Sequence, residues 1–169
     1  REVALRDYLH MIGKKSAFLF QASCELGARA ARASQKEISS LRQYGWHMGI
    51  AFQITDDILD IYGKKEFGKP LGQDIRERKR GSILTLFAFE EFPARKRRAV
   101  ERMLGGDSLN DSDASLVMSD IKKTGAKERA LALAKTHIAR AKASLNALKA
   151  TPHRDILGKL AEFALQRGK

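Results

Sequence analysis

The sequence GIAFQITDDILDIY, which runs from Gly49 to Tyr62, places three carboxylates in a stretch that is otherwise almost wholly apolar. Between Ile50 and Tyr62 lie eight apolar residues, three Asp, one Gln and one Thr, with no Lys, Arg or His. A helix that is apolar on every side is buried. A buried carboxylate is unfavourable unless it is protonated, paired with groups from elsewhere, or bound to a metal ion. The stretch therefore predicts a buried helix that carries a functional site.

The rest of the 169-residue chain also predicts helices, because it is rich in helix-forming residues and has only three Pro. We expect one all-α domain over residues 1–169, a helical bundle with one structured loop at 63–81. Ser34 followed by Glu37 predicts a capping box at the start of the central helix, and Gly63 fits its end. The expected helices are 3–34 with a bend at Gly13, 34–62, 82–92, 95–104, 113–124, 126–150 and 152–166.

The net charge is +12, from 32 basic and 20 acidic residues, and the excess lies after Lys64. Such a balance indicates an anionic partner or a strongly solvated surface. A basic bundle that binds nucleic acid is one interpretation, but after Phe92 the only Phe, Trp or Tyr is Phe163. It also leaves the buried Asp residues unexplained. We therefore expect a diphosphate-bearing substrate and no nucleic acid.

Cysteine content and hydropathy indicate the compartment. The single cysteine, Cys24, excludes an internal disulfide framework, and we expect it to be a small core residue. The first residues have no signal-peptide pattern, and no apolar run approaches the roughly 18 residues of a spanning helix. We expect a cytoplasmic protein without a transmembrane segment. The four His, which lack metal-ligand spacing, are expected at the surface or on helix faces.

The acidic residues of the central helix recur at spacings that bring them to about one face. Gln53, either Asp56 or Asp57, and Asp60 are separated by three or four residues each. Carboxylates one turn apart can converge on a hard cation, and Mg²⁺ is held by one or two carboxylates together with substrate phosphates. The alternative is an acidic stripe on a solvated helix, which the apolar flanking residues disfavour.

Cations stand on both sides of this helix in the sequence. The loop that follows it is rich in Gly and basic residues, which suit a phosphate ligand, although such a loop by itself is more often simply solvated. In the first helix, Lys14 and Lys15 either extend along the surface or project into a cavity toward diphosphate. The basic residues of the loop are Lys64, Lys65, Lys69, Arg76, Arg78, Lys79 and Arg80.

Taken together in this order, these motifs resemble the C-terminal half of the trans-isoprenyl diphosphate synthases, the polyprenyl synthetase family. The stretch that ends in Asp56-Asp57-Ile-Leu-Asp60 is similar to the second aspartate-rich motif of that family. Lys15-Ser16-Ala17 resembles its Lys-Thr-Ala/Gly element, with Ser keeping the hydroxyl group. The segment 68–79, GKPLGQDIRERK, resembles its Gly-Lys and Asp-containing loop.

The resemblance implies an isoprenoid-synthase fold and a Mg²⁺-dependent condensation of an allylic diphosphate with isopentenyl diphosphate in isoprenoid biosynthesis. Metal and cations would stabilise the departing diphosphate. The implied metal-site carboxylates are Asp56, Asp57, Asp60 and Asp74. The residues implied around the diphosphate are Lys15, Gln53 and Lys69 as catalytic residues, with Lys79 as a further phosphate contact.

The sequence also departs from the family pattern. The family has two aspartate-rich motifs that face each other, but Asp56 to Asp60 has no counterpart upstream in this chain. Members of the family are considerably longer. We therefore expect a fragment, from a truncated gene product or from proteolysis, that is inactive alone, whereas the intact enzyme is expected to be a homodimer. The alternative is a non-catalytic helical partner subunit with a degenerate site.

Overall fold

The structure is a computed structural model that describes residues 4–63, 71–77, 81–106 and 109–166. Across these ranges every regular element is a helix, which confirms the all-α prediction. None of the described helices combines the length and the apolar character that crossing a bilayer requires. The chain divides into two compact units, of which unit 1 holds residues 4–8 and 56–130 and unit 2 holds residues 9–55 and 131–166. The single domain over 1–169 stays a prediction.

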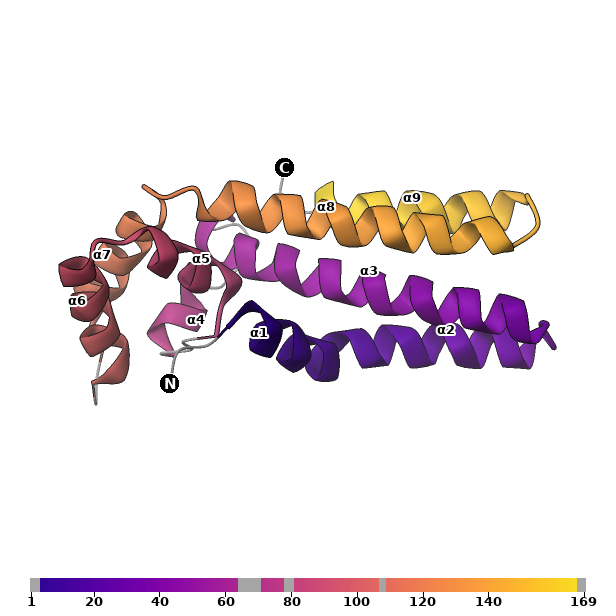
Figure 1. Cartoon of the computed structure of the whole chain (residues 1–169), viewed down its shortest axis with the longest axis horizontal. Coiled ribbons are helices and arrows are strands. Elements are labelled where there is room, and N and C mark those ends of the chain that lie inside the picture. Colours follow the sequence, from indigo (N-terminus) through magenta and orange to yellow (C-terminus); the bar gives the residue numbers. More distant parts are fainter. Residues whose placement is uncertain (1–3, 64–70, 78–80, 107–108, 167–169) are drawn as a thin grey trace. The chain divides into compact units, whose positions relative to one another are not determined.

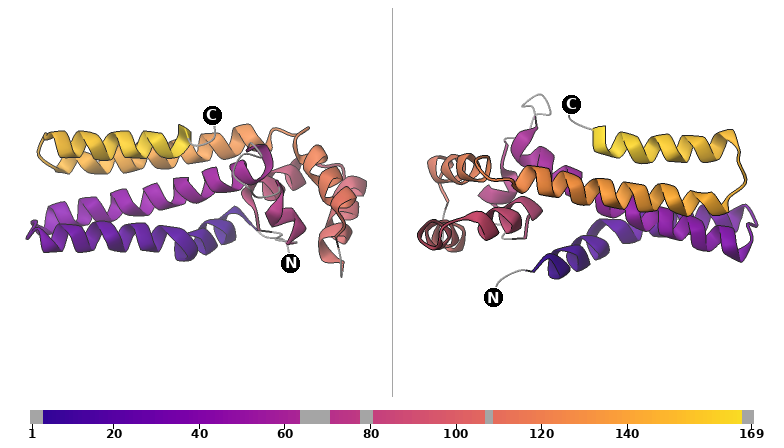
Figure 2. Two further views of the ribbon diagram at one scale, coloured as in Figure 1. Left: turned by 180° about the vertical axis from the view of Figure 1, so that it is seen from behind. Right: turned by 45° about the horizontal axis from the view of Figure 1, so that its top comes forward.

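Unit 2 is built on two long antiparallel helices, α2 (Phe18–Ala30) and the greater part of α3 (Gln35–Tyr62). Figures 1 and 2 show the two lying side by side. Glycine makes this contact close: a Cβ added at Gly45 would lie 2.5 Å from the carbonyl oxygen of Phe20, and one added at Gly49 would lie 2.5 Å from Cα of Ala17. Gly45 and Gly49 therefore permit the close approach of the two helices.

The ends of α3 are set by local hydrogen bonds. The backbone N–H of Ser34 donates to Oε2 of Glu37 at 2.9 Å, and the N–H of Glu37 donates to Oγ of Ser34 at 3.4 Å. This reciprocal pair confirms the predicted capping box. At the other end the N–H of Gly63 donates to the carbonyl oxygen of Leu59, and the helix stops at Tyr62 as expected.

Unit 2 is completed by α8 (Ala126–Ser144) from residue 131 onward and by α9 (Pro152–Gln166). The hydroxyl of Tyr44 donates to the carbonyl oxygen of Leu157 at 2.8 Å, which ties α3 to α9. Cys24 is half-buried and packs against the same core, as predicted. The buried residues of this core are Tyr44, Ala51, Ile138, Ala141, Leu145, Ala161 and Ala164.

Unit 1 packs short helices around α5 (Ile83–Glu91), which is apolar on all sides and buried from Ile83 to Ala88. Its other helices are α4 (Gln73–Arg76), α6 (Ala94–Gly105) and α7 (Asp111–Ile121), together with the end of α3. Val100 and Leu104 of α6 are buried, as are Val117 and Ile121 of α7. The end of α3 is tied to this unit where the backbone N–H of Ile83 donates to Oδ2 of Asp57.

Three boundaries differ from the sequence-based expectation. The first helical stretch consists of α1 (Leu5–Ile12), a π-helical turn η1 (Gly13–Ala17) and α2, so a π turn stands where a bend was expected. The expected loop at 63–81 contains the short helix α4. The last turn of the helix expected at 126–150 is a 3₁₀ helix, η3 (Leu145–Ala147).

Candidate functional site

The aspartate-rich motif lies at the end of α3 in unit 1, where its three carboxylates have different surroundings. Asp56 is exposed, Asp57 is only 5 % exposed and Asp60 is half-buried. The conflict between charge and burial that the sequence predicts is therefore real for Asp57 and partial for Asp60, and the prediction of burial is wrong for Asp56. Their hydrogen bonds show how it is resolved.

Asp57 is paired with groups from two other segments. Its Oδ2 accepts from the hydroxyl of Tyr8 at 3.1 Å and from the backbone N–H of Ile83, also at 3.1 Å. Ile83 is the first residue of α5, so its N–H is one of the donors that a helix start leaves unpaired. Burial, followed by the charge of Asp57, raises the pKa of Tyr8 far above its ordinary value. The phenol thus stays protonated and keeps donating to the carboxylate.

Asp60 holds the start of α4. Its Oδ1 accepts from the N–H of Gln73 at 2.9 Å, its Oδ2 accepts from the N–H of Asp74 at 3.2 Å, and its carbonyl oxygen accepts from the N–H of Gly72. Gly72 has a φ of 73°, a conformation that favours glycine. Asp60 therefore fixes the position of Asp74, which stands 14 residues later in the chain.

Asp56 is the carboxylate best placed to accept a ligand. It makes no hydrogen bond or ion pair with any other described residue, and it stands one helical turn before Asp60. Asp60 accepts from the N–H groups of Gln73 and Asp74, and each carboxylate oxygen has two lone pairs. Within the described ranges, however, no three Asp, Glu, His or Cys side chains form a ready-made metal cluster. The donors suit a hard divalent ion whose remaining ligands come from substrate or water.

Two of the candidate residues outside the motif, Lys15 and Gln53, belong to unit 2. Lys15 is exposed, and it belongs to the π turn η1 of unit 2, a type of irregularity common at functional sites. Its neighbour Ser16 donates through Oγ to Oε1 of the buried Gln53 at 2.7 Å. Lys69 and Lys79 lie outside the described residues. The roles of Lys15, Gln53, Lys69 and Lys79 stay predictions.

The sequence did not indicate two pairs of polar residues that the fold brings together. Tyr8 of α1 is a partner of Asp57. His47 and His137 place their Nδ1 atoms 3.1 Å apart between α3 and α8. His137 lies on a helix face, one of the two expected positions, and it is only 7 % exposed. Burial lowers the pKa of both imidazoles, that of His137 to about 4.

Solved structures of prenyl synthases share this fold. The chain matches a polyprenyl synthase from Caulobacter crescentus CB15, described as complexed with calcium and isoprenyl diphosphate, with a TM-score of 0.93 and 34 % identity, over 99 % of this chain and 51 % of that one. A decaprenyl diphosphate synthase from Rhodobacter capsulatus matches with a TM-score of 0.87 and 33 % identity, over 99 % and 51 % of the two chains. The arrangement of helices is thus that of the isoprenyl synthases.

Sequence comparison identifies the family. The profile of the polyprenyl synthetase family matches residues 1–121. Heptaprenyl diphosphate synthase component 2 of Geobacillus stearothermophilus is 36 % identical over 166 residues, covering 98 % of this chain and 49 % of the relative. Geranylgeranyl diphosphate synthase of Sulfolobus acidocaldarius is 36 % identical over 173 residues, covering 99 % and 51 %. The chain belongs to the polyprenyl synthetase family, and it spans about half the length of the curated relatives it matches.

Proposed function

We propose that this chain is part of a prenyltransferase that condenses an allylic diphosphate with isopentenyl diphosphate. The observation that carries the proposal is the arrangement of Asp56 and Asp60 one turn apart on α3, with Asp56 exposed and without a protein partner among the described residues. Its relatives are isoprenyl diphosphate synthases, and one solved relative is described with calcium and isoprenyl diphosphate. A divalent ion and a diphosphate therefore fit these donors chemically.

In this proposal Asp56 and Asp60 hold Mg²⁺, and Asp57 and Asp74 complete the predicted carboxylate set. Bound Mg²⁺ would neutralise the negative charge of the departing diphosphate. Asp57 also positions the site, because it ties the end of α3 to Tyr8 and to the start of α5. Asp60 orients the segment that carries Asp74.

The predicted lysines and the side-chain amide of Gln53 are proposed to act on the diphosphate rather than on the metal ion. Lys15, Lys69 and Lys79 are proposed to bind diphosphate oxygens as point charges. Gln53 is proposed to contribute its side-chain amide, oriented by the hydrogen bond from Ser16. The intact enzyme is proposed to be a homodimer.

Calorimetry tests the metal and diphosphate roles directly. A non-hydrolysable allylic diphosphate analogue is titrated into the wild-type chain with Mg²⁺ or with EDTA. We expect binding only with Mg²⁺, and a loss of at least about tenfold in affinity in Asp56→Ala. Asp155→Ala, which removes an exposed carboxylate of α9, is the matched control and should bind like the wild type. Equal heats from wild type and Asp56→Ala would remove the proposed ligand role.

The condensation step is proposed to need more than these 169 residues, since the resemblance implies a second aspartate-rich motif that the chain lacks. A second candidate function is that of a subunit acting with a separate polypeptide, which is favoured by two relatives named component 2. Product formation is measured with the chain alone and after mixing with a polypeptide that carries the first motif. Product formed only in the mixture supports both candidate functions, the part of a longer prenyltransferase and the subunit of a two-polypeptide enzyme. Product formed by the chain alone contradicts both.

A further inference from the structure

Helix α6 carries a row of arginines that have no role in the proposed prenyl transfer. The helix holds five basic residues and one Glu. Two of the cations are occupied: Nε of Arg97 lies 3.1 Å from Oε1 of Glu101, and Nζ of Lys96 lies 2.6 Å from Oδ1 of Asp120. The remaining three are Arg95, Arg98 and Arg102.

These three arginines lie on one face of α6, because their spacings are three and four residues. All three are exposed, and within the described ranges none of them has a hydrogen bond or ion pair. A guanidinium group without a protein partner can bind an anionic ligand.

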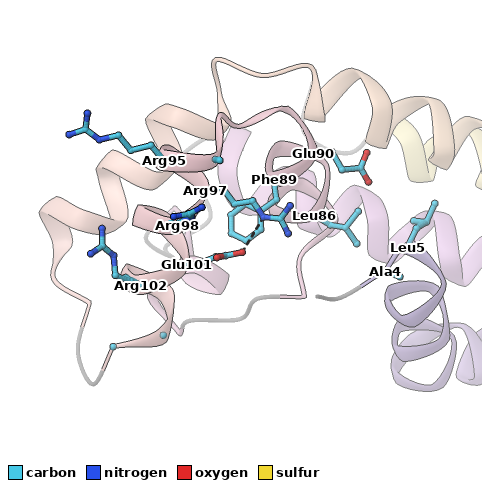
Figure 3. A pocket seen from close by; sticks show the side chains of 13 residues that line it. Ala4, Leu5, Leu86, Phe89, Glu90, Arg95, Arg97, Arg98, Glu101 and Arg102 are labelled. Carbon is cyan, nitrogen blue, oxygen red and sulfur yellow. Dashed lines mark hydrogen bonds and ion pairs between the residues drawn. The ribbon is translucent and has the colours of Figure 1, made fainter. Parts of the chain in front are cut away.

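An open cleft of about 1460 Å³ runs along one flank of α6, and the three arginines line it (Figure 3). Its other wall is α5, where Phe89 lies with its ring centroid 5.7 Å from Cζ of Arg97. Arginine forks match the geometry of phosphate oxygens and can bind them bidentately. The cleft is also lined by Glu90 and Glu101, whose carboxylates pair with Arg129 and Arg97. The charge and the donors for a phosphate group therefore come from the three arginines that have no partner among the described residues.

The opposite flank of α6 is apolar. A hollow of about 420 Å³ between α6 and α7 is lined by Ala99, Met103 and Leu116, and Arg95 borders both this hollow and the basic cleft. Leu116 is 49 % exposed beside this hollow. The volume falls within the range of about 300–1,000 Å³ that small-molecule sites occupy. An apolar ligand would cover Leu116.

We propose that α6 is a binding site for a phosphate-bearing amphiphile. The phosphate lies against Arg95, Arg98 and Arg102, and the hydrocarbon chain passes over the small side chain of Ala99 into the hollow beside Leu116. A nucleic-acid backbone would satisfy the arginines but would leave the apolar hollow empty. The same chemistry is offered by a soluble prenyl phosphate and by an anionic phospholipid in a membrane. The site is independent of the carboxylates of α3.

Calorimetry on the 169-residue chain in EDTA tests the site without the metal-dependent one. The probes are dodecyl phosphate, inorganic phosphate and dodecyl maltoside, each below its critical micelle concentration. Because dodecyl phosphate alone has both the head and the tail, we expect it to bind at least about tenfold more tightly than either of the others. Equal affinity for inorganic phosphate and dodecyl phosphate would overturn the proposal.

Variants locate the binding. The double variant Arg98→Ala/Arg102→Ala removes contacts to the phosphate, and Leu116→Ser removes a contact to the hydrocarbon chain. Each should weaken the binding of dodecyl phosphate by at least about tenfold. The controls are Lys135→Ala/Lys159→Ala, which removes the same charge from exposed positions elsewhere, and Ile156→Ser, which replaces a side chain that is 51 % exposed. Equal weakening in site and control variants would overturn the proposal. Circular dichroism verifies that each variant is folded.

Sedimentation with phosphatidylcholine vesicles, with and without phosphatidylglycerol, identifies the source of the ligand. Binding to phosphatidylglycerol vesicles that the site variants lose and the controls keep supports a membrane lipid as the ligand. Binding of dodecyl phosphate without vesicle binding supports a soluble prenyl phosphate. If neither dodecyl phosphate nor the vesicles bind, the proposal is overturned.

Discussion

Replacing Tyr8 with Phe isolates the hydrogen bond that secures the buried Asp57. Tyr8 is only 1 % exposed and Asp57 5 %, so water cannot replace the lost hydroxyl. A hydrogen bond to a charged group contributes about 1.5–3 kcal/mol. The oxygen–oxygen distance of 3.1 Å is long for such a bond, which argues against the upper limit. We expect Tyr8→Phe to lower the free energy of unfolding by about 2 kcal/mol.

Urea denaturation followed by circular dichroism measures this change. For a chain of this size about 2 kcal/mol corresponds to a melting temperature lower by about 4–8 °C. Tyr62→Phe is the matched control, because the half-buried Tyr62 hydroxyl has no hydrogen bond to another described residue and the ring keeps its contact with Nζ of Lys127. It should stay within about 0.5 kcal/mol of the wild type. Equal stabilities of wild type and Tyr8→Phe would refute the role of this hydrogen bond.

The same pair of proteins predicts a pH dependence. Burial, followed by Asp57, raises the pKa of Tyr8 in the folded chain, whereas an unfolded Tyr titrates near about 10. Above that pH the unfolded state binds fewer protons than the folded state, so the contribution of Tyr8 to stability falls. The difference between wild type and Tyr8→Phe should therefore be constant below about pH 9 and shrink above about pH 10.

Two further changes test packing and titration. Gly49→Ala should destabilise the chain by about 1–3 kcal/mol, because the new Cβ meets the backbone of Ala17. Gly27→Ala, where an added Cβ meets nothing within 4 Å, should instead stabilise α2 by about 0.5–1 kcal/mol; equal urea midpoints for the two variants would contradict the close contact. In an NMR titration the imidazole of His137, buried beside His47, should titrate near pH 4, and stability should fall as the pH drops below about 6.5, where the unfolded state binds the extra proton. A midpoint near 6.5 would show that His137 is not buried as described.

Local patterns predicted much of the fold. The capping box of Ser34 and Glu37 and the end of α3 before Gly63 depend on residues within a few positions of one another. Helical periodicity and glycine spacing are sufficient to show these features. The short helix α4 was missed because four residues that follow a glycine of positive φ give no periodic signal.

The environment of the site could be predicted only in part. The sequence showed that carboxylates are buried, but the partners of Asp57 stand 49 residues before it and 26 after it. Such contacts depend on the course of the whole chain, and no spacing rule indicates them. The pairing of His47 with His137 across 90 residues was missed for the same reason. Of the three options for a buried carboxylate, Asp57 uses pairing, since it accepts from the Tyr8 hydroxyl and from the Ile83 N–H. The proposed role of binding a metal ion belongs to the exposed Asp56.

The central claim is that the aspartates at the end of α3 bind a divalent ion together with diphosphate. Replacing Mg²⁺ with paramagnetic Mn²⁺ in the presence of inorganic diphosphate, and recording amide NMR spectra of the chain, tests it most directly. We predict selective line broadening at residues 55–62 and 72–76 that disappears in Asp56→Ala. Broadening confined to other helices, or unchanged in Asp56→Ala, would contradict the claim.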